Sequence, residues 1–234
     1  MDKPLVLEFA QFLLKIGLWQ WDQHLMGPIE AHFRTNYVEY EVGAMCCMVK
    51  LIGNNFVRSE EFLSLIEDSV RMRLNYMVKN EKPTEEFITV ESLRNLTDGL
   101  SALGDGSRKR LFGLLKTMIV LAHRDGRDLL AEDPRLLTQV VRLLCDFQIG
   151  VGAELHEIIQ GAVSSAKFSG LPEMSYLALC TAPEESKYIS EATKSKLFQQ
   201  IEDRVSALGG TERLVLSIQE RLALAIPSYT MDAA

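Results

Sequence analysis

Apolar residues recur at intervals of three and four along most of the chain, and this spacing predicts α-helices. The first helical region has an apolar face of Leu5, Phe9, Phe12, Leu13 and Ile16. A second region extends from Pro28 to Ile52, and Asn36 marks a candidate break within it. β-branched residues do not cluster into alternating runs, as they would in strands.

Polar residues of cap type indicate where later helices begin, because their side-chain oxygens accept hydrogen bonds from free N–H groups of the first turn. The expected N-caps are Ser59, before Glu60 and Glu61; Asp133, before Pro134; and Thr181, three residues before Glu184. Other helices are expected after Thr84, from 108 to the RDG sequence at 124–126, at 151–168, at 189–208 and at 211–225. The sequence thus predicts an all-α fold of nine to ten helices, joined as antiparallel pairs by short connections.

Two neighbouring segments look like turns of one repeating scaffold. RLFGLLKTMIVLA, from Arg110, and RLLTQVVRLLCDF, from Arg135, share Arg, Leu, a bulky third residue and the spacing of later aliphatic residues. From about Pro28 to Ala225, the series of paired helices resembles HEAT-, armadillo- and MIF4G-type α-solenoids in its general texture. The resemblance implies a HEAT/ARM-like α-solenoid, and an irregular helical bundle is the alternative fold.

We expect one all-α domain over residues 1–226 and a flexible C-terminal tail over 227–234. Residues 1–25 are a candidate N-terminal capping or interface helix. Hydrophobic residues make up 47% of the 234 residues, which is enough for a sizeable core. The start of the chain lacks the features of a signal peptide, and no apolar run is long enough to span a bilayer. We therefore expect a soluble protein of the cytoplasm or nucleus.

The four cysteines form no C-x-x-C pair, and we expect all of them to be buried thiols that act as small hydrophobic residues. For Cys145 and Cys180, the helical and apolar settings predict raised thiol pKa values. The other two are Cys46 and Cys47.

No pattern in the sequence indicates catalysis or metal binding. A G-x-S-x-G motif and an H-E-x-x-H motif are both missing, and pairs of glutamates stand where helices are expected to begin, which explains them as caps. We therefore expect no enzyme, no catalytic residues, no metal and no cofactor. The histidines are scattered, at His24, His32, His123 and His156.

Cations gather where the sequence predicts the start of a helix, although the net charge of the chain is -7. Ser107 is the expected N-cap, so the next three residues fill the first turn, where the helix dipole disfavours each cation by roughly 0.3 to 1 kcal/mol at low salt. Such a helix start can bind a phosphate or an acidic segment of a partner, or its side chains can simply extend into solvent. The predicted binding residues are Arg108, Lys109, Arg110, Lys116, Arg124, Arg127 and Arg135.

Trp19 and Trp21 are about 200° apart around a helix, so both cannot fill one core face. Either residue is a candidate interface anchor, and insertion beneath a neighbouring loop is the alternative.

These observations predict a non-enzymatic adaptor that presents a helical surface with a local basic face to an acidic or phosphorylated protein partner. The alternative is a translation- or virus-related RNA-binding scaffold that uses the same cations. The negative net charge and the scarcity of aromatic residues near the cations argue against general binding of nucleic acid. We expect no membrane partner, and the oligomeric state stays open.

Overall fold

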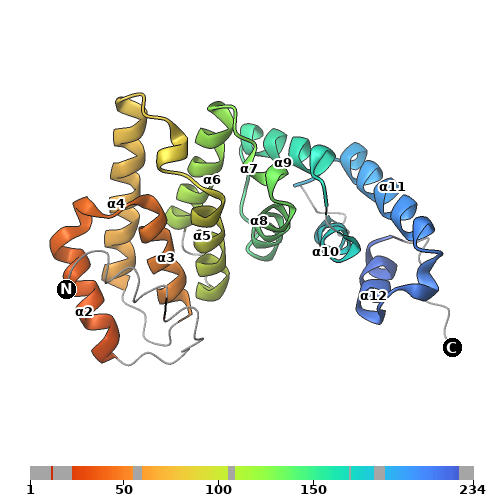
Figure 1. Ribbon diagram of the computed structural model, residues 1–234, viewed down its shortest axis with the longest axis horizontal. Helices are drawn as coiled ribbons and strands as arrows, with labels where there is room; N and C mark the ends of the chain where they lie inside the picture. Colours follow the sequence, from red (N-terminus) through yellow and green to blue (C-terminus); the bar gives the residue numbers. More distant parts are fainter. Residues whose placement is uncertain are drawn as a thin grey trace. The chain divides into compact units, whose positions relative to one another are not determined.

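The computed structural model of the protein confirms the all-α prediction, since every regular element in its described residues is helical (Figure 1). The structure describes residues 12, 23–54, 60–104, 109–168, 170–181 and 188–226. The α-helices are α2 (Gln23–Asn36), α3 (Val42–Gly53), α4 (Glu60–Lys79), α5 (Val90–Leu103), α6 (Lys109–Arg124), α7 (Leu129–Glu132), α8 (Pro134–Asp146), α9 (Ala153–Ser165), α10 (Leu171–Thr181), α11 (Glu191–Ala207) and α12 (Leu216–Ala225). Three 3₁₀ helices are η1 (Tyr37–Glu39), η2 (Thr84–Glu86) and η3 (Thr211–Arg213).

Several helix ends follow the sequence pattern. Asp133 caps α8 as predicted, because its side chain accepts a hydrogen bond from the backbone N–H of Arg135 at 3.2 Å, and Pro134 takes the first position. The predicted break at Asn36 is the end of α2. The predicted cap Ser59 and the first predicted helix, apart from residue 12, lie outside the described residues.

Other helix ends differ from the prediction. α2 begins at Gln23, so Pro28 lies inside the helix, where its fixed φ is helical although its missing N–H removes one hydrogen bond. Thr181 is the last residue of α10 and is not an N-cap; Ser190 caps α11 and accepts a hydrogen bond from the Thr193 N–H at 3.3 Å. The short helix α7 and the helix α10 have no counterpart in the predicted set. The spacing of Thr181 and Glu184 is that of a helix start. It is misleading here, because apolar residues lie on both sides of Thr181 and do not mark where the helix begins.

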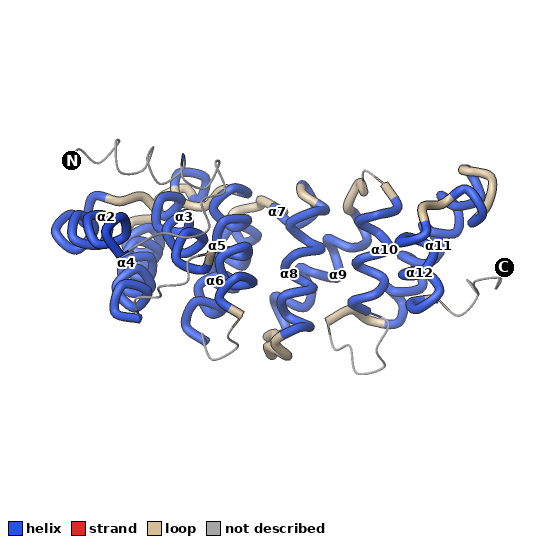
Figure 2. Tube along the Cα trace, turned by 90° about the horizontal axis from the view of Figure 1, so that it is seen from below, coloured by secondary structure: helices blue, strands red, loops and turns tan. Residues whose placement is uncertain are grey.

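The chain divides into two compact units, Met1–Arg127 and Asp128–Ala234. In the first unit, α3 and α6 each pack against both α4 and α5. In the second unit, α8 packs against α9 and α10, α11 packs against the same two helices, and α12 packs against α10 (Figure 2). Some helices, such as α3, α8 and α10, therefore pack against both the helix that follows them in the chain and the helix after that. The single domain over 1–226 stays a prediction, and the tail 227–234 lies outside the described residues.

The first unit is built around α3, in which ten of twelve residues are buried. α3 runs parallel to α5, because the first residues of both helices lie around one hollow and the last turn of α3 meets the second half of α5. In the last turn of α3, the Lys50 Nζ lies 2.6 Å from the Asp98 Oδ2. Near the end, a Cβ added to Gly53 would lie 2.5 Å from the Gly99 carbonyl oxygen. The two backbones touch at these glycines, which leave no room for a side chain.

We predict that Gly99→Ala destabilises the first unit, because the added Cβ would lie 2.7 Å from the Lys50 backbone nitrogen and force α3 and α5 apart. Overpacking of this kind costs about 1 to 3 kcal/mol of the free energy of unfolding. Urea denaturation followed by circular dichroism measures this quantity. The matched control is Gly113→Ala in α6, where an added Cβ meets nothing within 4 Å. The control should gain about 0.5 to 1 kcal/mol from helix propensity, and equal effects of the two substitutions would contradict the close contact.

Candidate functional site

The structure places the predicted basic residues in different settings. Lys109 and Arg110 are exposed in the first turn of α6, and the Arg110 guanidinium lies 3.9 Å from the carboxylate of Asp68 on α4. Both partners of this ion pair are exposed, so it contributes at most about 1 kcal/mol. Arg135 is exposed in the first turn of α8, in the second unit. Arg108 lies outside the described residues.

The remaining predicted cations are Lys116, Arg124 and Arg127, and each has a different environment in the first unit. Lys116 is half-buried, and this burial lowers the pKa of its ammonium group. Arg124 stands in the last turn of α6, where a cation complements the negative end of the helix dipole. The Arg127 Nη1 donates a hydrogen bond to the Ile88 carbonyl oxygen at 2.8 Å, which gives Arg127 a structural role. Trp19 and Trp21, the predicted interface anchors, lie outside the described residues.

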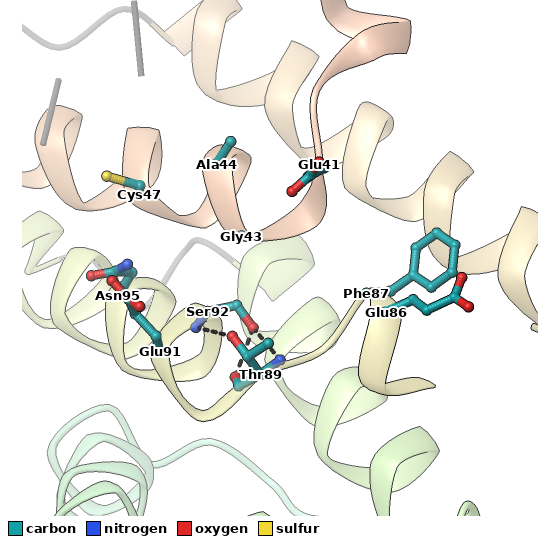
Figure 3. A pocket seen from close by; sticks show the side chains of 10 residues that line it. All are labelled: Glu41, Gly43, Ala44, Cys47, Glu86, Phe87, Thr89, Glu91, Ser92 and Asn95. Carbon is teal, nitrogen blue, oxygen red and sulfur yellow. Dashed lines mark hydrogen bonds between the residues drawn. The ribbon is translucent and has the colours of Figure 1, made fainter. Parts of the chain in front are cut away.

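A hollow of about 210 Å³ lies where the N-terminal ends of α3 and α5 meet the segment of η2 (Figure 3). Because α3 and α5 are parallel, their starting residues face each other across it. Its lining residues are Glu41, Gly43, Ala44, Cys47, Glu86, Phe87, Thr89, Glu91, Ser92 and Asn95.

The hollow is acidic. Three of its lining residues, Glu41, Glu86 and Glu91, are exposed carboxylates, and none of the described residues that line it is a cation. The positive ends of the two helices offset about half a charge each, which leaves the site with a net charge of about -2. Lys50, the cation whose charge acts on Cys47, is paired with Asp98. A positively charged group therefore finds a favourable potential in the hollow.

The floor of the hollow is rigid because α5 begins with a reciprocal cap. The Thr89 side chain accepts a hydrogen bond from the Ser92 N–H at 3.1 Å, and the Ser92 Oγ accepts one from the Thr89 N–H at 2.9 Å (Figure 3). α3 differs from α5, because the side chain of its N-cap residue, Glu41, makes no capping hydrogen bond.

The wall that carries Glu86 and Phe87 is anchored to the turn after α6. One Asp125 carboxylate oxygen accepts hydrogen bonds from the Thr84 Oγ1 at 2.6 Å and from the Thr84 backbone N–H at 3.0 Å. These bonds lower the pKa of Asp125. Together with the bond from Arg127 to Ile88, they fix both ends of the η2 segment.

The lining residues favour binding over chemistry. Burial raises the pKa of the Cys47 thiol to about 11, so at neutral pH it is a thiol and a poor nucleophile. Within the described residues, no three histidine, cysteine or carboxylate side chains are grouped to hold a metal ion. None of the helices described by the structure is both long and apolar enough to cross a membrane.

Comparison with protein-family models, with curated proteins and with solved structures found no match to this chain. Sequence reasoning does not find the hollow. Glu41 lies inside the predicted helical region from Pro28 to Ile52, and Glu86 belongs to a pair of glutamates that is explained as a helix start. The signal that the sequence offers is that Glu41, Glu86 and Glu91 lie next to or within the first turns of three helices, α3, η2 and α5.

We predict a pH-dependent loss of stability for Thr84→Val, which removes the hydroxyl donor to Asp125. The pKa of Asp125 is lowered below its ordinary value of 3.8 in the folded protein. The carboxylate therefore stabilises the fold above that value, and this contribution is lost as the pH falls through the folded pKa. The variant should melt at a lower temperature than the unmodified protein at pH 7, and the difference should shrink toward about pH 2.

Thr84→Ser is the control for this prediction, because it keeps the hydroxyl and should retain most of the melting temperature at pH 7. A difference between Thr84→Val and the unmodified protein that is equal at both pH values would assign the loss to packing and contradict the role of Asp125.

Proposed function

We propose that the protein is a non-enzymatic interaction module of the cytoplasm or nucleus, in which helix pairs stack as in an α-solenoid and the acidic hollow binds a basic segment of a partner protein. The stacking is supported by the contacts of helices with the next but one, and by the parallel course of α3 and α5.

The observation that carries the proposal is the charge of the hollow, whose described lining residues include three carboxylates and no cation. A lysine or arginine side chain is the complementary group in a protein partner. Its long aliphatic part suits a narrow hollow between helix ends, and Phe87, half-buried beside Glu86, can receive the cation against its ring (Figure 3).

The uncapped start of α3 adds a second kind of contact. The first N–H groups of a helix have no partner within the helix, and the Glu41 side chain does not supply one. Gly43, in this first turn, lines the hollow and leaves the space next to its Cα open. A backbone carbonyl of an extended partner segment can accept from these N–H groups while its basic side chain meets the carboxylates. The hollow thus suits an extended basic peptide better than a small cation.

The test is the affinity of a fluorescein-labelled, lysine- and arginine-rich peptide, measured by fluorescence anisotropy. We expect Glu86→Gln/Glu91→Gln to weaken binding about tenfold or more, the equivalent of about 1.4 kcal/mol, because two of three carboxylates lose their charge. The matched control is Glu81→Gln/Glu85→Gln, which changes the net charge equally at exposed residues that do not line the hollow.

The control variant should bind the peptide nearly as well as the unmodified protein. Equal losses in both double variants would show a general effect of net charge, and no binding by the unmodified protein at low salt would exclude the hollow as a basic-peptide site.

A second candidate is the binding of an acidic or phosphorylated partner at the start of α6. The observation that favours it is the absence of any acid from the first turn of this helix, in which Lys109 and Arg110 are exposed. Lys116 follows Lys109 by seven residues and so lies on the same face of the helix. An RNA that bound at these cations would give the alternative function.

We predict that Lys109→Ser/Arg110→Ser weakens the binding of an acidic phosphoserine peptide about fivefold or more, with Lys79→Ser/Lys82→Ser as the charge-matched control at exposed residues. The same proteins are titrated with a labelled single-stranded RNA at increasing salt. RNA affinity that falls steeply with salt and drops in the first variant alone would assign the cations to RNA. Equal peptide binding by both variants would exclude this surface.

A further inference from the structure

Two cysteines that are far apart in the sequence meet in the second unit. Cys145 stands in the last turn of α8 and Cys180 in the last turn of α10. The Cys145 thiol donates a hydrogen bond to the Cys180 carbonyl oxygen at 3.2 Å, which places the two cysteines in direct contact. The sequence predicts buried thiols at both positions, but both residues are only half-buried, because they lie at helix ends where neighbouring helices cover them incompletely.

Cys46 and Cys47 provide a contrast within the same chain. Both are buried in α3, and burial raises the pKa of their thiols to about 12 and about 11. At neutral pH their sulfurs are protonated and shielded from solvent. They are therefore poor targets for any solution oxidant.

We propose that Cys145 and Cys180 form a reversible disulfide between α8 and α10 when the protein meets a peroxide. The proposal rests on the contact of the Cys145 sulfur with the Cys180 residue, on the partial exposure of both cysteines and on their position within one compact unit. It is independent of the acidic hollow, which lies in the other unit.

The environment assigns different roles to the two sulfurs. The hydrogen bond from Cys145 lowers the pKa of Cys180, and Arg142 favours the same thiolate, while burial and Asp146 oppose it. The pKa of Cys145 is raised by its hydrogen bond to Cys180 and by burial, as the sequence predicts for this residue. For Cys180 the predicted rise is wrong, because the contact with Cys145 is invisible in the sequence. The geometry points the same way, because the Cys145 S–H is engaged by the Cys180 carbonyl oxygen. Cys180 is thus the attacking thiol, and Cys145 is the resolving one.

The reaction has two balanced steps. The Cys180 sulfur attacks one oxygen of hydrogen peroxide, the O–O bond breaks, and the leaving hydroxide takes up the thiol proton as water, which leaves a sulfenic acid on Cys180. The Cys145 sulfur then attacks the sulfenic sulfur, the S–O bond breaks, and hydroxide leaves with the Cys145 proton as a second water. Two thiols are oxidised to one disulfide while one peroxide is reduced to two waters. A dithiol reductant reverses the change.

The charged and polar groups around the pair belong to the same helix ends. Arg142 and Asp146 of α8 form an ion pair at 3.4 Å, and the Tyr188 hydroxyl donates to the Leu144 carbonyl oxygen at 2.8 Å. The disulfide would join the C-terminal ends of α8 and α10, which already pack against each other. Oxidation is therefore expected to stiffen this contact without a change of fold.

The first experiment treats the whole protein with hydrogen peroxide, blocks remaining thiols with iodoacetamide and digests it with trypsin under non-reducing conditions. We expect peptide 143–167 linked to peptide 168–187, a loss of about 2 Da for the linked pair, and its release by a dithiol. Peptide 35–50, which carries Cys46 and Cys47, should be recovered without oxidation and without a disulfide link. If the linked pair does not form at peroxide concentrations that leave Cys46 and Cys47 reduced, the proposal is wrong.

The second experiment separates the roles with dimedone, which labels sulfenic acids. Cys145→Ser should accumulate label on Cys180, since the resolving thiol is missing, and Cys180→Ser should leave Cys145 unlabelled. Label on Cys145 in the Cys180→Ser variant would overturn the assigned roles. Far-UV circular dichroism and melting curves establish that both variants are folded, and the disulfide test on the unmodified protein does not depend on either variant.

Discussion

The contact between α3 and α5 constrains the first unit more than any other interaction. α3 is apolar around most of its circumference, so it must be covered on several sides, and Gly53 and Gly99 allow the α5 backbone to approach closely enough to do so. The pair formed by Lys50 and Asp98 lies beside the glycines and fixes the register. A parallel pair in this register brings both helix starts to the same end, and that juxtaposition creates the acidic hollow.

The sequence predicts the individual helices well and their partners poorly. The periodic apolar faces and the cap at Asp133 are local features, and within the described residues the structure is helical where most of them predict a helix. Gly99, in contrast, sits within a helical pattern and reads only as a weak helix former, because its packing role depends on a partner almost fifty residues earlier in the chain. The prediction misses α10 for another reason. The cap spacing at Thr181 indicates the start of a helix, whereas Thr181 is the last residue of α10.

The same limit applies to the candidate sites. Arg127 belongs to a group of cations in the sequence. In the structure its side chain donates a hydrogen bond to the Ile88 carbonyl oxygen and so stabilises the η2 segment. Glu41, Glu86 and Glu91 each have a local explanation as helix-start acids, and only the parallel packing of α3 and α5 turns them into one surface. Cys145 and Cys180 lie in two helices whose contact no local pattern records.

The acidic hollow lies at the ends of α3 and α5, and the cysteine pair lies at the ends of α8 and α10. In each case one helix separates the two along the chain, and the packing of the helices explains why. A helix that contacts its successor and the next helix but one buries its sides against them, as α3 and α10 do. Side chains from distant segments can then meet with access to solvent mainly where helices end. Helix starts carry a positive dipole and so favour acids, as in the hollow, whereas helix ends disfavour a thiolate. Cys180 stands at such an end, so its lowered pKa depends on the hydrogen bond from Cys145 and on Arg142. The pair therefore acts as a unit in disulfide formation, because Cys180 supplies the attacking sulfur and Cys145 the resolving one.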